Sequence, residues 1–223
     1  MRKTKEEAEI TRQKILAAAR RVFHQNGVAH SSLELVAKNA GVTRGAIYWH
    51  FKDKTALFFA MQQDACKTLD TKIHQSFTNP QWQNPLDAIA AGLKTFFMTL
   101  DCDPDVQSIF KIMALKCEYV GEFESVIHTL MQPAGQFLKQ LEKLYQEAQN
   151  KNVLKNGLNP QFLAIDTATY VNGLVHYWAT EEIQHWQKNI FELIDSHLAL
   201  RRVELPQKHK NPRQTRKNFE NNF

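Results

Sequence analysis

Residues 42–54 read VTRGAIYWHFKDK, and this stretch decides how the chain is interpreted. It combines a glycine, an adjacent tyrosine and tryptophan, a histidine, and the positive charges of Arg44, Lys52 and Lys54. A helix that only fills a core needs one apolar stripe, and it has little use for this mixture of side chains. We therefore expect the segment to face a binding partner.

The segment completes a helix-turn-helix pattern. The spacing predicts a short helix over residues 33–40, a glycine turn, and a second helix over residues 43–51. Ser31 and Glu34 have the spacing of a capping box for the first helix. Thr43 can cap the second helix. Two short helices joined in this way predict a DNA-binding unit, and the alternative is a plain pair of helices within a bundle.

The second helix has distinct inner and outer faces, because successive helical residues turn by about 100°. Ile47 and Phe51 are expected to point into the core, whereas Gly45 and Trp49 point away from it. A slim outer face can enter the major groove of DNA. In the alternative, Trp49 covers a neighbouring helix. Several side chains around this face can donate to bases or phosphates: Arg44, Tyr48, His50, Lys52 and Lys54.

Charge is unevenly distributed along the 223 residues, whose net charge is +5. Residues 1–54 carry 11 basic and 5 acidic side chains, a net of +6. Residues 55–200 carry 10 lysines and 16 acids, a net of −6, and residues 201–223 return to +5. A basic N-terminal part on an acidic body predicts that the N-terminal part contacts a polyanion. The alternative is that these charges belong to ordinary solvated helix faces.

The rest of the chain is also predicted to be helical. Asp53 opens a long apolar pattern of about 24 residues. Three further helices are predicted to start where an Asx residue precedes a proline, at Asn84, Asp103 and Asn159. Pro133 should kink or break the helix predicted over residues 122–150. With a last helix over residues 187–202, these patterns predict an all-α chain of about nine helices.

Three parts follow from these patterns. We expect residues 1–54 to form a helix-turn-helix domain, residues 55–205 to form a second, helical domain, and residues 206–223 to form a basic, disordered tail. The last helix carries an apolar stripe with no obvious use on the surface of a monomer. We therefore predict dimerisation through Tyr177 and that stripe, which consists of Ile190, Ile194 and Leu198.

Several classes of protein are disfavoured. No apolar run approaches the roughly 18 residues of a membrane span, and no signal peptide is recognisable. Three separated cysteines do not form a disulfide framework, which favours the reducing cytoplasm. His176 and His185 lie too far apart for a local metal motif, so neither a metal nor a cofactor is predicted. Since no local catalytic arrangement stands out either, we do not expect an enzyme.

Residues 32–58, SLELVAKNAGVTRGAIYWHFKDKTALF, resemble the DNA-binding domain of the TetR family of bacterial transcriptional regulators. Residues 1–16, MRKTKEEAEITRQKIL, and residues 116–123, KCEYVGEF, are similar to its AcrR-like branch, which represses multidrug efflux genes. The likeness reaches about residue 202, and the basic tail departs from it. It implies a cytoplasmic homodimer that binds a palindromic operator and leaves the DNA when a small hydrophobic or cationic effector binds.

The resemblance also implies roles for individual residues. Its matching positions assign base reading to Arg44, Gly45 and Trp49. The implied phosphate contacts are made by Ser32, Thr43, Tyr48, His50 and Lys54.

The resemblance also implies that the helical bundle of residues 55–205 serves for ligand binding and dimerisation, so the effector site is expected within it. The aromatic and methionine side chains of its helices can contact a lipophilic ligand, although ordinary core packing is the simpler explanation for each of them. The predicted ligand contacts are Phe97, Phe110, Met113 and Trp178. Glu118, Glu122 or Asp166 would offset the charge of a cationic ligand, unless they are ordinary surface positions.

Two other hypotheses stay open at this point. A regulator of the same fold could respond to a protein partner or to cysteine oxidation instead of a small molecule. Alternatively, the helix-turn-helix could be incidental to a helical enzyme or scaffold.

Overall fold

The protein is helical throughout the described part of its chain. The computed structural model describes residues 4–118, 126–180 and 186–203, and within these ranges its only strand-like pairing is an isolated bridge between Leu154 and Arg202. These ranges contain nine helices, which confirms the predicted all-α class: α1 (Lys5–Asn26), α2 (Leu33–Ala40), α3 (Arg44–His50), α4 (Lys54–Thr78), α5 (Pro85–Cys102), α6 (Pro104–Leu115), α7 (Val126–Asn150), α8 (Pro160–Ala179) and α9 (Trp186–Ala199).

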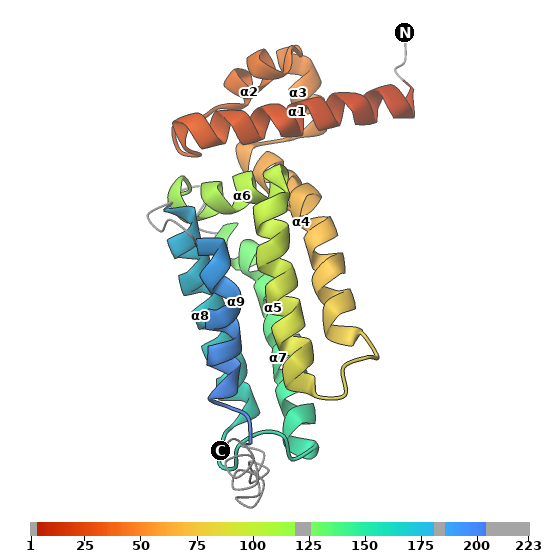
Figure 1. Ribbon diagram of the computed structural model, residues 1–223. Coiled ribbons are helices and arrows are strands. Elements are labelled where there is room, and N and C mark those ends of the chain that lie inside the picture. The colour runs from red at the N-terminus through yellow and green to blue at the C-terminus, as the bar shows by residue number, and fades with distance from the viewer. Residues whose placement is uncertain (1–3, 119–125, 181–185, 204–223) are drawn as a thin grey trace, which may run out of the picture.

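Figure 1 shows two parts stacked end to end. Helix α1 lies across one end of a bundle formed by α4, α5, α7, α8 and α9, and α2 and α3 lie on the side of α1 away from that bundle. Helix α6 lies crosswise between α1 and the bundle. The helix-turn-helix therefore occupies one end of the molecule. In the described ranges, no helix has both the length and the apolar content to span a bilayer.

The buried side chains form two hydrophobic clusters. The N-terminal core joins α1, α2 and α3 with the first part of α4, and Ile109 and Ile112 of α6 also belong to it. The bundle core joins the remaining part of α4 with α5, α7, α8 and α9. The N-terminal core therefore extends beyond residue 54, the position at which we predicted the boundary between the first two domains. Phe110 of α6 contacts both cores.

The Asx–Pro signals start helices as predicted, because Asn84, Asp103 and Asn159 cap α5, α6 and α8. The predicted cap at Ser31 is wrong. Ser32 caps α2 by accepting a hydrogen bond from the Leu35 amide at 3.1 Å. The Ser31 hydroxyl is buried and donates to the Gly27 carbonyl at 2.6 Å, so it is already used by the preceding turn.

Helix α7 continues through Pro133, so of the predicted kink or break the break does not occur. A proline in a helix removes one backbone donor and crowds the carbonyl four residues before it, and a helix can accommodate both by bending instead of ending. Two other predictions lie outside the described residues: the helix start at Glu122 and the tail of residues 206–223.

The predicted dimerisation stripe on α9 is wrong in its residues. Ile190, Ile194 and Leu198 are 1%, 0% and 1% exposed within the single chain, where they belong to the bundle core. An amphipathic helix buries its apolar stripe against whatever lies beside it, and here the neighbouring helices belong to the same chain. Tyr177 on α8 is 57% exposed, so its predicted role in a dimer remains open.

Candidate DNA-binding site

The turn between α2 and α3 is fixed by backbone geometry. Gly41 has a φ of +67°, the left-handed conformation that glycine adopts readily, and its amide donates to the Ala37 and Lys38 carbonyls. The Val42 amide also donates to the Ala37 carbonyl, at 3.0 Å. Thr43 then caps α3 by accepting a hydrogen bond from the Ala46 amide at 3.1 Å. The direction of α3 relative to α2 follows from these bonds.

The two faces of α3 are arranged as its sequence predicts. Ile47 and Phe51 are 0% and 5% exposed, whereas Trp49 is 73% exposed. A side-chain carbon added at Gly45 would meet no atom within 4 Å, so this position opens to solvent. The Trp49 ring lies edge-on to His50, with 4.5 Å between ring centroids. Because Trp49 is so exposed, it does not serve to cover a neighbouring helix in this chain.

Glu34 on α2 holds two of the predicted DNA contacts on α3. Its Oε1 lies 3.3 Å from Nε of Arg44 and accepts a hydrogen bond from the Tyr48 hydroxyl at 2.9 Å. The Arg44 guanidinium lies over the Tyr48 ring, 5.6 Å from its centroid. A backbone hydrogen bond, the Tyr48 hydroxyl and the Arg44 charge lower the pKa of the Glu34 carboxyl. Sequence reasoning missed this role, because an acid near a helix start has an ordinary explanation there.

The remaining predicted phosphate contacts surround the same helix pair. Ser32 and Thr43 are exposed caps whose hydroxyl oxygens accept from backbone amides. The Ser32 hydroxyl also donates to the Glu34 carboxylate, whereas the hydroxyl hydrogen of Thr43 can be donated to another group. Lys54 donates to the Ala29 carbonyl at 3.3 Å, and Lys52 lies 3.6 Å from the Asp53 carboxylate. His50 is half-buried. The site thus consists of the exposed Trp49 ring surrounded by hydrogen-bond donors. The contacts of these groups with DNA are still predictions.

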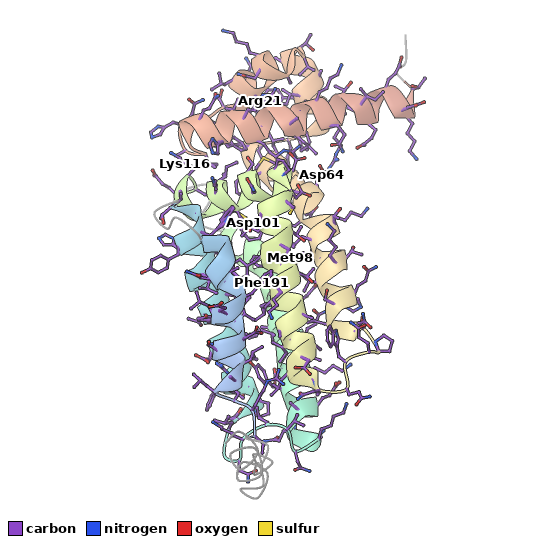
Figure 2. The ribbon with its side chains drawn as sticks, viewed as in Figure 1. Arg21, Asp64, Met98, Asp101, Lys116 and Phe191 are labelled. Atoms are coloured by element: carbon purple, nitrogen blue, oxygen red, sulfur yellow. The ribbon has the colours of Figure 1, made fainter. Side chains whose placement is uncertain are left out.

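The four predicted ligand residues are spread over two cores. Phe97 is buried in the bundle core, whereas Met113 packs against the N-terminal core and Phe110 contacts both. Met113 and Phe97 therefore belong to different cores, which Phe110 on α6 connects. The Trp178 indole donates to the Asp101 carboxylate at 3.2 Å, at the end of α5 nearest α6 (Figure 2).

The acids considered as partners for a cationic ligand differ in their surroundings. Asp166 is paired with Arg201, which leaves it less suited to offset a ligand charge. Glu118 is exposed, and Glu122 lies outside the described residues.

The helix-turn-helix part is joined to the bundle by charged and backbone contacts. Nη2 of Arg20 on α1 lies 2.8 Å from Asp105 on α6, and its Nη1 lies 3.8 Å from Asp64 on α4. The Val28 amide donates to the Lys116 carbonyl at 2.9 Å. Figure 2 shows Asp64 and Lys116 around this junction. A surface pocket of about 390 Å³ lies between α1 and α6, and it is lined by none of the four predicted ligand residues.

Known proteins resemble both parts of the chain. The sequence profile described as "Bacterial regulatory proteins, tetR family" matches residues 15–61, and that of the "MAATS-type transcriptional repressor, C-terminal region" matches residues 84–202. The transcriptional regulator AcrR of Shigella flexneri is 33% identical over 180 residues, which are 79% of this chain and 82% of AcrR.

Solved structures agree with these matches. NalD of Pseudomonas aeruginosa, described as the secondary repressor of the MexAB-OprM multidrug efflux pump, has a TM-score of 0.78 and 25% identity, covering 90% of this chain and all of NalD. SmeT, solved in complex with triclosan, has a TM-score of 0.76 and 26% identity, covering 91% of this chain and 98% of SmeT. The chain belongs to the TetR family of bacterial transcriptional regulators, within which it is a DNA-binding repressor of the AcrR-like branch rather than an enzyme.

Proposed function

We propose that this repressor controls a multidrug efflux pump, that it binds a palindromic operator as a homodimer, and that a small lipophilic compound releases it. The observation that carries the proposal is the outward face of α3, where Trp49 is 73% exposed and the Arg44 side chain, although paired with Glu34, is 74% exposed. NalD is the repressor of such a pump and SmeT binds triclosan, which supports the same assignment for this chain.

DNA contact follows from the two faces of α3. With Ile47 anchored in the core, the outer face enters the major groove, where Arg44, Gly45 and Trp49 meet base edges. Phosphates on either side are held by the surrounding donors: Ser32, Thr43, Tyr48, His50, Lys52 and Lys54. These contacts fix the position of the helix on the duplex, and Arg44 supplies the base preference.

A different surface replaces the buried α9 stripe as the proposed dimer interface. Helices α8 and α9 are neighbours, since the Tyr170 ring stacks on His197 with 3.9 Å between centroids. Both helices also expose large apolar side chains, which on a monomer would cost free energy and which mark an interaction surface when they cluster. These side chains are Phe162, Ile165 and Tyr177 on α8, and Leu193 on α9. Two copies related by a two-fold axis would match a palindrome.

Release requires that an effector bind more tightly to a conformation that does not fit DNA. The two parts of the molecule share α4 and α6, so a shift of either helix within the bundle moves the helix-turn-helix. A small molecule is a better trigger than oxidation of Cys66, because burial raises the pKa of that thiol to about 12 and keeps it protonated. By reciprocity, operator DNA must weaken effector binding by the same factor.

The experiment uses an operator selected by the wild-type protein from a pool of random duplexes. Affinity for this operator is measured by fluorescence anisotropy at fixed salt, with and without triclosan as the probe. The Arg44→Ala variant should lose base discrimination by roughly 1–3 kcal/mol at one base pair per half-site. Failure to select any sequence would overturn the proposal. Equal triclosan affinities with and without operator would overturn release by this class of compound.

A further inference from the structure

Glu34 lies beside the side chains proposed to contact DNA, although its carboxylate is negatively charged, as the DNA phosphates are. The Glu34 side chain is 45% exposed, and its carboxylate contacts Arg44 and Tyr48 through the same oxygen atom. Together with the stacking of the Arg44 guanidinium on the Tyr48 ring, these contacts make one three-residue unit across α2 and α3. We call it the Glu34 triad.

We propose that Glu34 is a positioning residue that determines sequence specificity, and this inference rests on the proposed DNA contact of α3. In the free protein, Glu34 holds the Arg44 side chain in place. Its negative charge also disfavours complexes in which the protein contacts only the phosphates of DNA. The ion pair runs through Nε of Arg44, whereas donation to O6 and N7 of a guanine uses the two Nη atoms. Base reading can therefore proceed while the triad stays intact.

The charge of Glu34 acts differently on specific and non-specific DNA. Non-specific binding depends on attraction between basic side chains and phosphates, so an added carboxylate in the interface weakens it for every sequence. At the operator, base contacts by an already ordered Arg44 compensate for this repulsion, since less side-chain freedom is lost on binding. Glu34 thus widens the difference in affinity between operator and random DNA.

A purely structural role for Glu34 makes a different prediction. Glu34 lies in the first turn of α2, where a negative charge favours the helix through its dipole. Removing the charge would then lower the melting temperature and weaken binding to all DNA by the same factor. The Glu34→Gln variant separates the two roles, because its amide oxygen still accepts from Tyr48 but the charge is gone.

The test compares wild-type protein, Glu34→Gln and Glu192→Gln. Glu192 is an exposed acid on α9, so its variant controls for net charge without changing the triad. Anisotropy titrations use the selected operator and a scrambled duplex at several salt concentrations. For Glu34→Gln we expect about 3- to 10-fold tighter binding to the scrambled duplex and a slope of log affinity against log salt that is steeper by up to about 0.9. Operator affinity should stay unchanged, because the lost order of Arg44 offsets the lost repulsion, so the specificity ratio falls by about 3- to 10-fold, while Glu192→Gln leaves the ratio unchanged.

A second comparison tests whether Glu34 acts through Arg44. In the Arg44→Ala background, adding Glu34→Gln should no longer reduce discrimination at the base pair that Arg44 reads. An unchanged specificity ratio for Glu34→Gln, or an equal loss on both duplexes with a lower melting temperature, would overturn the inference. If the wild-type protein itself does not prefer the operator, the proposed function fails first, and the inference fails with it.

Discussion

Replacing Gly92 by alanine tests how α4 packs on α5. A side-chain carbon at this position would lie 2.0 Å from Cε1 and 2.4 Å from Cδ1 of the Phe77 ring. Carbon atoms in contact are normally about 3.5–4.0 Å apart, so the ring would have to move by more than about 1 Å. Phe77 is 5% exposed and stacks on Phe137 with 5.9 Å between centroids, which restricts that movement.

The expected cost follows from two opposing terms. Overpacking a well-filled core costs about 1–3 kcal/mol, whereas alanine is favoured over glycine within a helix by about 1 kcal/mol. We therefore expect Gly92→Ala to lower the free energy of unfolding by up to about 2 kcal/mol. For a chain of this size, that corresponds to a fall in melting temperature of up to about 8 °C.

Thermal unfolding followed by circular dichroism at fixed protein concentration provides the assay. Gly135→Ala on α7 is the matched control, because a carbon added there meets no atom within 4 Å and should raise the melting temperature slightly. The double variant Phe77→Leu/Gly92→Ala should lose less stability than the sum of its single changes, since leucine leaves room for the new methyl group. A rise in melting temperature for Gly92→Ala, or strict additivity in the double variant, would refute the packing argument.

Two further predictions concern the bundle. If the proposed interface is correct, Ile165→Glu or Leu193→Glu should yield monomers by light scattering at micromolar concentration. Ile194→Ala in the bundle core should instead lower the free energy of unfolding by about 2–5 kcal/mol without a direct effect on assembly. A dimeric Ile165→Glu variant would exclude this part of the proposed interface. The pKa of His197 is lowered from 6.5 to about 4 by burial and by Arg201, so the unfolded chain binds the proton more readily, and stability should fall as the pH drops from about 6.5 towards 4. Urea unfolding of wild-type protein and His197→Phe between pH 7.5 and 5 should show a smaller loss of stability in the variant, and equal losses would argue against a neutral, half-buried His197.

Local sequence signals predicted the parts of the fold that depend on neighbouring residues. A proline after Asn84, Asp103 or Asn159 marks a helix start because both residues act within one turn. The two faces of α3 follow from the 100° rotation per residue, which placed Ile47 inside and Trp49 outside. Such signals did not distinguish Ser31 from Ser32 as the cap of α2. Either serine could have capped the helix, and the choice depends on the preceding turn, where Ser31 donates to the Gly27 carbonyl.

Contacts between helices could not be predicted in the same way. An apolar stripe shows that a helix buries one side, but the periodicity is the same whether the stripe packs on a helix of the same chain or on a second copy. Ile194 packs within its own chain. Similarly, the composition of α6 did not indicate that Met113 and Phe97 lie in different cores. The role of Glu34 depends on the angle between α2 and α3, so it becomes visible only when the fold brings Glu34 beside Arg44.

For the proposed release from DNA, the position of α6 gives the bundle a second connection to the helix-turn-helix besides α4. The long helix α4 begins at Lys54, beside the helix-turn-helix, and continues into the bundle, so tilting it moves the DNA-binding end. Helix α6 provides a second connection. Phe110 packs against Phe96 of the bundle with 5.4 Å between ring centroids, while Ile109 and Ile112 are fully buried in the N-terminal core.

A helix is stiff on the scale of one turn, so α6 cannot shift at Phe110 without also shifting Ile109. The same movement changes the Arg20–Asp105 contact and the hydrogen bond from Val28 to the Lys116 carbonyl. An effector that displaces the Phe96–Phe110 pair would therefore move α1 directly, even if α4 stayed in place. Because close-packed cores tend to switch between discrete arrangements rather than deform continuously, both connections are expected to change together, which would make release cooperative within each subunit.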